Sequence, residues 1–318
     1  MAMTFTRTVD SMYASTWRKC IGETVNQIFG KTRLLSFLNS KKKIMPRGGK
    51  ELQWPVLAER GNAPTWFGAD GELGKEGDDA TRVVRYYWKY LGGSVKQVFT
   101  HTHQNAGPQQ IMDMVKDSIE LARLEISQEF EEAFNGDGST TNGPNGYKNL
   151  ISTSPTSSLT VGGWDQATYP WWQNQQYALS GDAVDYLRKD LYHLWLMCAT
   201  YGPEPDFSLC DRNAYELLLE VLEEKHQFMS DSMKDLGWPE TAIFAGKPII
   251  WSKEAEAETI RVVNLTDNFI FYDPNLWMKM GKWIEAQGNV NRVAHILSGC
   301  NMVSRRRATS GVLTAVDG

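Results

Sequence analysis

The strongest constraint on the fold of this chain is one long amphipathic segment, residues 108–134. Its apolar side chains follow one another at steps of three or four residues, as the buried face of a helix requires. They are Ile111, Val115, Ile119, Ala122, Ile126, Phe130 and Ala133. Pro108 suits the first helical turn, and Asn135 with Gly136 suits a left-handed stop. At 1.5 Å per residue the predicted helix is about 40 Å long, enough to serve as the backbone of a flat molecule.

The composition is that of a folded chain. Of the 318 residues, 42% are hydrophobic and 22% are charged, so a sizeable core can form. The longest apolar stretch, around residues 192–200, is far shorter than the ~20 residues of a membrane span. Residues 1–19 lack the apolar region of a secretory signal. Widely separated cysteines predict reduced, buried thiols; they are Cys20, Cys198, Cys210 and Cys300.

The charge argues against a protein that acts by neutralising phosphates, because the net charge is −5. Two short basic runs, residues 41–43 and 305–307, are more typical of solvated faces or of ion pairs between subunits. Nucleic-acid recognition is the alternative for either run. Tryptophan is in excess, at 12 residues, which suits extensive interfaces or sugar-binding platforms.

Residues 60–80 form the most unusual segment. Their density of glycine excludes a core element, and uncommonly long loops in compact domains tend to be functional. The segment nevertheless carries Trp66 and Phe67, which a free loop would not normally expose. We therefore interpret it as an assembly device whose two rings are buried by a neighbouring subunit.

Extended segments flank this loop. Residues 51–57 predict a strand, and residues 82–102 predict a long β ribbon bent at Gly92 and Gly93. Both faces of the ribbon are aromatic or charged, so it suits a position between neighbours. The alternation predicts that one face of the ribbon carries the side chains of Val84, Tyr86, Trp88 and Tyr90.

The remaining pattern indicates an α+β chain in which helices are grouped. Residues 1–45 predict an arm with a short helix at 25–38, ordered only against neighbouring subunits because it has no core-forming stripe. Two further helices are predicted at 182–198, with an apolar stripe that includes Val184, and at 212–224, capped by Asp211. The predicted strands are residues 207–210, 243–244, 249–251, 260–265, 269–272, 289–305 and 311–316.

Motifs of catalysis or metal binding are weak. His101 and His103 share a strand face without an identifiable third ligand, and residues 135–141 suit a turn better than a calcium or phosphate loop. The acidic pairs 131–132 and 223–224 are interpreted as solubilising charges at helix ends. A ring cluster at Trp164, Trp171 and Trp172 predicts packing under a loop, with a sugar platform as the alternative. We predict no catalytic residue, no metal and no cofactor.

The order of these parts resembles the major capsid protein family of tailed bacteriophages. The resemblance covers residues 45–318 and rests on the order of six motifs. They are residues 72–76 and the ribbon 82–90 of an extended loop, the helix 109–134 with its exit turn 135–147, the strand and helix start 206–215, the turn 244–250, and the final strand 287–305.

The resemblance implies the tailed-phage major capsid shell fold, with four parts. These are an N-terminal arm (1–45), an extended β-hairpin loop (46–104), a peripheral domain with its spine helix at 108–134 (105–160 and 286–305), and an axial domain (161–285 and 306–318). It implies no enzyme activity and no cofactor. Some family members cross-link through a loop lysine and a distant asparagine; Lys75 occupies the loop here, but no asparagine partner is assigned.

The function implied is a structural one. Many copies would assemble as hexamers and pentamers into an icosahedral head that encloses double-stranded DNA without sequence-specific binding. A separate scaffolding protein, a portal and a decoration protein are the expected partners, and no membrane is expected. The expected location is the virion, after assembly in the host cytoplasm. The alternatives are a cellular nanocompartment shell of the same fold and an aromatic-rich carbohydrate-active protein.

The assembly contacts expected from this resemblance lie on the extended loop and its ribbon. They are Trp66, Phe67, Lys75, Arg82, Arg85 and Trp88.

Overall fold

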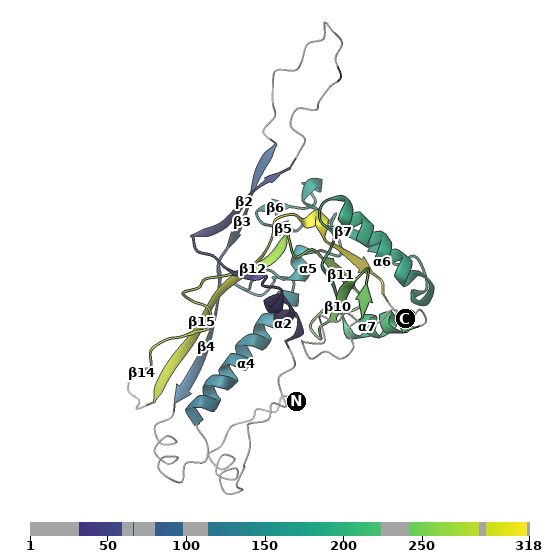
Figure 1. Cartoon of the computed structure of the whole chain (residues 1–318). Coiled ribbons are helices and arrows are strands. Elements are labelled where there is room, and N and C mark those ends of the chain that lie inside the picture. The colour runs from purple at the N-terminus through teal and green to yellow at the C-terminus, as the bar shows by residue number, and fades with distance from the viewer. Residues whose placement is uncertain are drawn as a thin grey trace. The chain divides into compact units, whose positions relative to one another are not determined.

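A computed structural model describes residues 32–58, 66, 80–97, 114–223, 242–285 and 291–316 (Figure 1). The chain is α+β, as predicted, and divides into two compact units. The smaller unit comprises Met1–Lys31, Leu91–Glu129 and Leu276–Ser298; the larger comprises Thr32–Tyr90, Phe130–Asn275 and Gly299–Gly318. These bounds differ from the four parts expected from the sequence, which stay a prediction.

The smaller unit is organised around the first part of β15 (Arg292–Ser304). This strand pairs antiparallel with β13 (Lys279–Met280) and β14 (Ile284–Glu285). It also pairs with β4 (Lys89–Gln97). A side-chain carbon on Gly93 of β4 would lie 3.1 Å from Cδ1 of Ile126, so the missing side chain permits close packing of strand and helix.

This arrangement corrects the predicted bend of the ribbon. The two glycines lie inside β4, and the break falls at Trp88, between β3 (Thr81–Tyr87) and β4. The part of the ribbon beyond residue 97 lies outside the described residues. The glycines therefore serve packing, because the backbone at Gly92 also approaches Leu297.

The long helix is confirmed as α4 (Met114–Asn135), with residues 108–113 outside the described part. Ala122, Ile126 and Phe130 are buried, as the stripe predicts. The stop differs from the prediction, because the first left-handed glycine is Gly138 (φ +70°) rather than Gly136. At the last turn the Asn135 side-chain amide donates to the Glu131 carbonyl oxygen at 2.7 Å.

The core of the larger unit is a six-stranded sheet in the order β7-β16-β11-β8-β10-β9 (Figure 1). The bounds of these strands are β7 Gln175–Ala178, β16 Gly311–Thr314, β11 Ile260–Val263, β8 Phe207–Cys210, β10 Lys247–Trp251 and β9 Ile243–Phe244. Two helices, α6 (Ala183–Thr200) and α7 (Arg212–Glu223), pack on it. The predicted strands at 207–210 and 243–244 are confirmed residue for residue.

Local signals predicted both helix starts correctly. The Asp182 side chain accepts from Val184 N at 3.1 Å, and Asp211 Oδ1 accepts from Ala214 N at 3.2 Å. The predicted apolar stripe of α6 is wrong at one position, because the Val184 side chain is 46% exposed. Trp195 is buried with the stripe residues Leu187, Leu191, Leu194 and Cys198.

The three described cysteines are free and buried. Desolvation raises the pKa of the Cys198 and Cys300 thiols to about 12, and raises the pKa of Cys210 as well. Cys20 lies outside the described residues. The described thiols are therefore protonated at neutral pH, in keeping with their predicted reduced state.

Over the described ranges, no helix is long and apolar enough to cross a membrane.

Residues 32–46 correct the predicted extent of the arm. Helix α2 (Arg33–Ser40) buries Leu34, Phe37 and Leu38 inside the larger unit, and Phe37 lies 4.9 Å from the ring of Phe207. Strand β1 (Ile44–Pro46) pairs in parallel with β12 (Asn268–Tyr272). This part of the chain is therefore ordered by the subunit itself, while residues 1–31 lie outside the described part.

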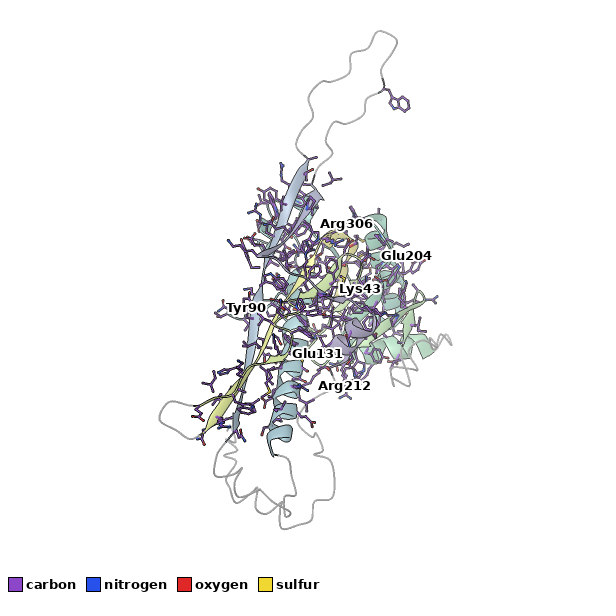
Figure 2. All side chains as sticks on the ribbon, turned by 60° about the vertical axis from the view of Figure 1, so that its left-hand side comes forward. Lys43, Tyr90, Glu131, Glu204, Arg212 and Arg306 are labelled. Carbon is purple, nitrogen blue, oxygen red and sulfur yellow. The ribbon has the colours of Figure 1, made fainter. Side chains whose placement is uncertain are left out.

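Glu131 is also a correction, since it was interpreted as a solubilising charge. It projects from the last turns of α4 (Figure 2) and is only 2% exposed. Its carboxylate accepts from Leu34 N, Leu35 N and Ser252 Oγ, each at 3.0 Å. It therefore caps the first turn of α2, whose N–H groups have no partner within the helix. Its neighbour Glu132 is exposed, as predicted.

Glu131→Ala removes the acceptor of two buried N–H groups and of the Ser252 hydroxyl. We expect the free energy of unfolding to fall by about 1.5–3 kcal/mol, the range for hydrogen bonds to a charged group. Denaturant titration measures it. Glu132→Ala, one residue away and exposed, is the matched control and should change stability by less than ~0.5 kcal/mol. Equal effects of the two variants would contradict the capping role.

The same site predicts a pH dependence. Desolvation raises the pKa of Glu131, so the folded chain binds this proton more tightly than the unfolded chain does. The wild type should therefore gain stability relative to Glu131→Ala as the pH falls through the raised pKa, until the unfolded carboxyl is also protonated. Parallel denaturant titrations between about pH 7 and about pH 4 measure the difference. A difference that shrinks with falling pH would show that the carboxylate is the favoured folded form.

Candidate assembly surface

The predicted contact residues lie on or beside a two-stranded hairpin in the larger unit. Strand β2 (Glu51–Leu57) pairs antiparallel with β3, with Leu52 opposite Tyr86 and Trp54 opposite Val84. Its bounds match the predicted strand. The pairing continues to Ala58, whose N–H donates to the Ala80 carbonyl at 2.8 Å.

One face of the hairpin is rooted in the subunit. Leu52, Trp54, Val84 and Tyr86 are buried. The Trp54 ring stacks on Phe271 of β12, with centroids 5.5 Å apart and planes 10° apart. The Tyr86 hydroxyl donates to the Ser304 carbonyl oxygen at 2.9 Å and accepts from Ser304 N at 3.3 Å. Because these contacts reach β12 and β15, the direction of the hairpin is tied to the subunit core.

The opposite face of the hairpin is exposed and carries both apolar and polar side chains. Leu57 is 78% exposed, Tyr87 59% and Val83 40%. Arg85 lies between the last two on the same face of β3. The apolar side chains of this face alternate with polar ones, because Arg85 pairs with Gln53 between Val83 and Tyr87. A partner that covers this face would therefore bury both kinds of side chain.

The outer edge of β3 is held by a tight turn between β5 (Thr160–Val161) and β6 (Trp164–Asp165). Arg85 N donates to the Gly162 carbonyl at 3.0 Å, and Trp164 Nε1 donates to the Val83 carbonyl at 2.9 Å. Gly162 has φ +62°, and a side-chain carbon there would lie 2.3 Å from Val84 Cγ1. Only glycine fits this contact, which blocks further strand pairing at that edge.

The six predicted contact residues do not form one cluster. Trp66 is fully exposed, at 105%, whereas Phe67 and Lys75 lie outside the described residues. Arg82 and Arg85 occupy opposite faces of β3, because their positions in the strand differ by three, an odd number. Their role in assembly stays a prediction.

Trp88 departs from its predicted position. Strand β3 ends at Tyr87, and Trp88 Nε1 donates to the Gly49 carbonyl at 2.7 Å. Tyr90, expected on the same face as Val84 and Tyr86, is 65% exposed. The alternation is confirmed for Val84 and Tyr86 and wrong beyond the break, because the break resets which face each side chain occupies.

The tryptophan cluster packs as a set of tilted rings. Trp164 meets Tyr169 at 88° and Trp171 at 63°, with centroids 4.9 and 5.5 Å apart. Trp172, in the short helix η1 (Pro170–Trp172), is 1% exposed and donates to the Val161 carbonyl at 2.8 Å. Because the rings contact one another edge to face and Trp172 is buried, the geometry favours the packing interpretation over the platform.

The basic run 305–307 separates into three environments. The Arg305 guanidinium lies over the rings of Phe269 (4.8 Å) and Trp54 (5.6 Å). Arg306, labelled in Figure 2, is exposed and donates to the Tyr201 carbonyl at 2.8 Å. Arg307 is 1% exposed. The run is therefore neither one solvated face nor one recognition patch, and only the fold reveals this.

Arg307 connects distant loops without a carboxylate partner. Its guanidinium donates to the carbonyls of Leu150 (2.8 Å) and Trp172 (3.2 Å) and to the side-chain oxygen of Gln166 (2.8 Å). Weaker contacts at 3.3 Å reach the Asn149 carbonyl and the Asn174 side chain. Burial lowers its pKa to about 10, so it remains charged at neutral pH.

A groove of about 870 Å³ lies beside this run and the hairpin base. Its lining comprises residues 54–57, 170–175, 305–308, Tyr201 and Asp267. The groove therefore combines aromatic walls with the guanidinium groups of Arg305 and Arg306. Nothing in the local sequence pattern indicates it, because its walls come from separate parts of the sequence between residues 54 and 308.

Metal chemistry finds no support in the part of the chain that the structure describes. No group of three or more His, Cys, Asp or Glu side chains gathers there in a geometry that could hold a metal ion. His101 and His103 lie outside this part. The absence of a metal or cofactor stays a prediction.

Comparison with solved structures identifies the fold. The chain superposes on the cyanophage A-1(L) capsid with a TM-score of 0.72 and 13% identity, over 93% of this chain and 96% of that one. It matches the SrpI encapsulin of Synechococcus elongatus PCC 7942 with a TM-score of 0.64 and 15% identity, over 96% and 95%. The match to the structure of Mycobacterium phage Bobi has a TM-score of 0.59 and 12% identity, over 94% of this chain and 96% of that one. No family profile and no curated protein matches the sequence.

The hydrogen bonds between the hairpin and β15 predict how loss of the Tyr86 hydroxyl changes stability. Tyr86→Phe leaves the buried Ser304 carbonyl without this donor and should lower the free energy of unfolding by about 1–2 kcal/mol. Tyr87→Phe removes an exposed hydroxyl from the next residue of the same strand and should leave stability within ~0.5 kcal/mol of wild type. Thermal and denaturant unfolding of the two variants decides. If Tyr86→Phe left the free energy of unfolding unchanged, the hydroxyl would not be stabilising the position of the hairpin.

Proposed function

We propose that this chain, which has the fold of tailed-phage capsid proteins, is a major capsid protein. In this proposal many copies assemble as hexamers and pentamers into an icosahedral head around phage double-stranded DNA. The observation that carries the proposal is the extent of the structural match, which spans 93% of this chain and 96% of the cyanophage capsid chain.

The exposed rings support an assembled state. Trp66 is fully exposed, and Leu57 and Tyr87 are more than half exposed, so the single chain leaves large apolar groups in water. Covering a large apolar side chain contributes roughly 1.5–3 kcal/mol. Repeated around every hexamer, even the part that remains after loop ordering favours association.

The charge is compatible with a DNA container. A net charge of −5 avoids strong attachment of packaged phosphates to the wall. The proposal includes a separate scaffolding protein, a portal and a decoration protein as partners. It places assembly in the host cytoplasm and the finished shell in the virion.

A cellular nanocompartment shell is the second candidate. The match to the encapsulin, with a TM-score of 0.64 over 96% of this chain, favours it specifically. The two candidates differ in content, since a phage head encloses nucleic acid and an encapsulin-like shell encloses protein cargo. Absorbance spectra and nuclease-protection assays of purified particles distinguish them: protected DNA supports the phage head, and protein cargo without DNA supports the nanocompartment.

The loop anchors provide the test of assembly. Trp66→Ser combined with Phe67→Ser should leave a soluble subunit with near wild-type helix content and melting temperature, because Trp66 is fully exposed on its own chain. Shell yield, measured by sedimentation and electron microscopy, should fall at least tenfold, the equivalent of about 1.4 kcal/mol.

The outcomes against this role of the loop are definite. If the double variant unfolds, the two rings belong to the core of the subunit. If it assembles as wild type does, the rings are not anchors. Tyr186→Ser, which removes a partly exposed ring from α6, is the control for loss of an aromatic side chain and should keep its shells.

A further inference from the structure

Strand β7 (Figure 1) lies at one edge of the six-stranded sheet. It pairs with β16 on one side, and no strand of the described ranges pairs with its other side. Gln175 N and Leu179 N each donate to a carbonyl oxygen on the β16 side at 3.0 Å. Because the direction of the main-chain groups alternates along a strand, those of Gln176 and Ala178 point away from the sheet. Both residues are exposed, so these N–H and C=O groups are available to pair with another chain.

The sequence of this edge strand contains none of the residues that usually block pairing. Natural edge strands carry lysine or proline, or are very short, because unpaired main-chain groups attract a further strand. Strand β7 has four residues, Gln175–Ala178, with no charge and no proline among them. By contrast, β9 at the other edge of the sheet has only two residues. The edge of β7 therefore suits a partner that adds to the sheet as a strand.

The groove at the hairpin base shares a residue with this edge strand. Gln175 is the first residue of β7 and also lines the groove, together with Arg305 and Arg306. Both arginines are exposed, and no described carboxylate pairs with them; their contacts are aromatic rings and the Tyr201 carbonyl. The acidic residue of the lining, Asp267, is only 8% exposed. An anionic partner would therefore meet two guanidinium groups without a competing acid.

These two features define the chemistry of the partner. Guanidinium groups bind carboxylates in a bidentate manner, and the rings of Trp54 and Phe269 hold Arg305 in position without cancelling its charge. The groove volume of about 870 Å³ lies within the range of ligand sites, roughly 300–1,000 Å³. The net charge of −5 disfavours a nucleic acid as the partner. An extended acidic peptide suits both surfaces, because its main chain can pair with β7 while its carboxylates reach the arginines.

We propose that β7 and the groove bind an extended acidic segment of a partner protein by strand addition. The segment lies along Gln176 and Ala178 and places its carboxylates against Arg305 and Arg306. The inference goes beyond the proposed shell function, because it concerns a surface of the single subunit and a protein other than this chain.

Synthetic peptides test the contact. Two fluorescent peptides carry a pair of glutamates at the N-terminal or the C-terminal end of a Thr-Val repeat, which favours an extended chain. Each is titrated with the full-length, unassembled protein, and fluorescence anisotropy reports binding. We expect one of the two to bind, since the direction of the added strand decides which end reaches the groove. Its counterpart with glutamines in place of the glutamates should bind at least tenfold more weakly.

Variants of the protein separate the two parts of the site. Arg305→Glu with Arg306→Glu should weaken binding of the peptide at least tenfold. Arg188→Glu with Lys189→Glu makes the same charge change on an exposed face of α6 and should leave binding unchanged. Gln176→Pro removes an outward N–H and keeps the bonds to β16, so it should abolish binding while the fold persists. Circular dichroism and thermal unfolding check that each variant is folded.

Amide hydrogen exchange distinguishes strand addition from attraction between charges alone. In the complex, exchange at Gln176 and Ala178 should slow at least tenfold, because their N–H groups become hydrogen bonded. Exchange at Tyr177, whose main-chain groups point toward β16, is the internal control and should change much less. Binding that leaves exchange at Gln176 and Ala178 unchanged overturns the inference, because no strand has been added.

Other contrary results are equally definite. Absence of binding by both peptides, or equal binding by every protein variant, overturns the inference. Single-stranded DNA that binds through the two arginines, without peptide binding, makes the groove a phosphate site and also overturns it. If the wild type binds neither peptide and Gln176→Pro abolishes its self-assembly, the edge belongs to a second copy of the chain and the inference is wrong.

The outcome for the shell proposal is separate. If a peptide binds as expected and the purified protein forms no shells, the shell proposal fails alone. If shells form and neither peptide binds, only this inference fails.

Discussion

The packing of Trp54 and Tyr86 against the subunit is the interaction on which the proposed function depends. An isolated two-stranded hairpin is marginally stable in water. Here one face is fixed by the stack of Trp54 on Phe271 and by the bond from Tyr86 to the Ser304 carbonyl. Because that face packs against the core of the subunit, the opposite face, with Leu57 and Tyr87, is exposed to solvent. The same residues that stabilise the hairpin thereby leave large side chains exposed on its other face, where a neighbour can cover them.

Buried charges join segments that are far apart in the sequence. Glu131 holds the first turn of α2 from a position 97 residues away, and Arg307 binds the Leu150 carbonyl from 157 residues away. Each is satisfied by hydrogen bonds rather than by an opposite charge, which offsets the desolvation cost only while every partner is present. The N-terminal helix and the loops around Trp172 are thus tied to the core by polar contacts as well as by packing.

Elements with a local signal were predictable from the sequence. The long stripe of α4, the start of α6 at Asp182, the cap Asp211 and five strands of the six-stranded sheet depend on neighbouring residues, and the structure confirms them. The sixth strand, β7, was not predicted. Three features failed because they depend on distant partners: the burial of Glu131, the inclusion of α2 in the core, and the division of the run 305–307. The prediction that Gly92 and Gly93 bend the ribbon failed for the same reason, since these glycines allow Leu297 and Ile126 to pack close to the backbone of β4. The groove is lined by five separate parts of the sequence and leaves no pattern in any one of them.

The central claim is that this chain is built to associate with copies of itself. Sedimentation velocity with electron microscopy of the purified wild-type protein, across salt and pH and with a scaffolding partner present, tests it most directly. We expect closed particles tens of nanometres across whose walls resolve into hexamers and pentamers. A protein that stays monomeric under every one of these conditions would contradict it.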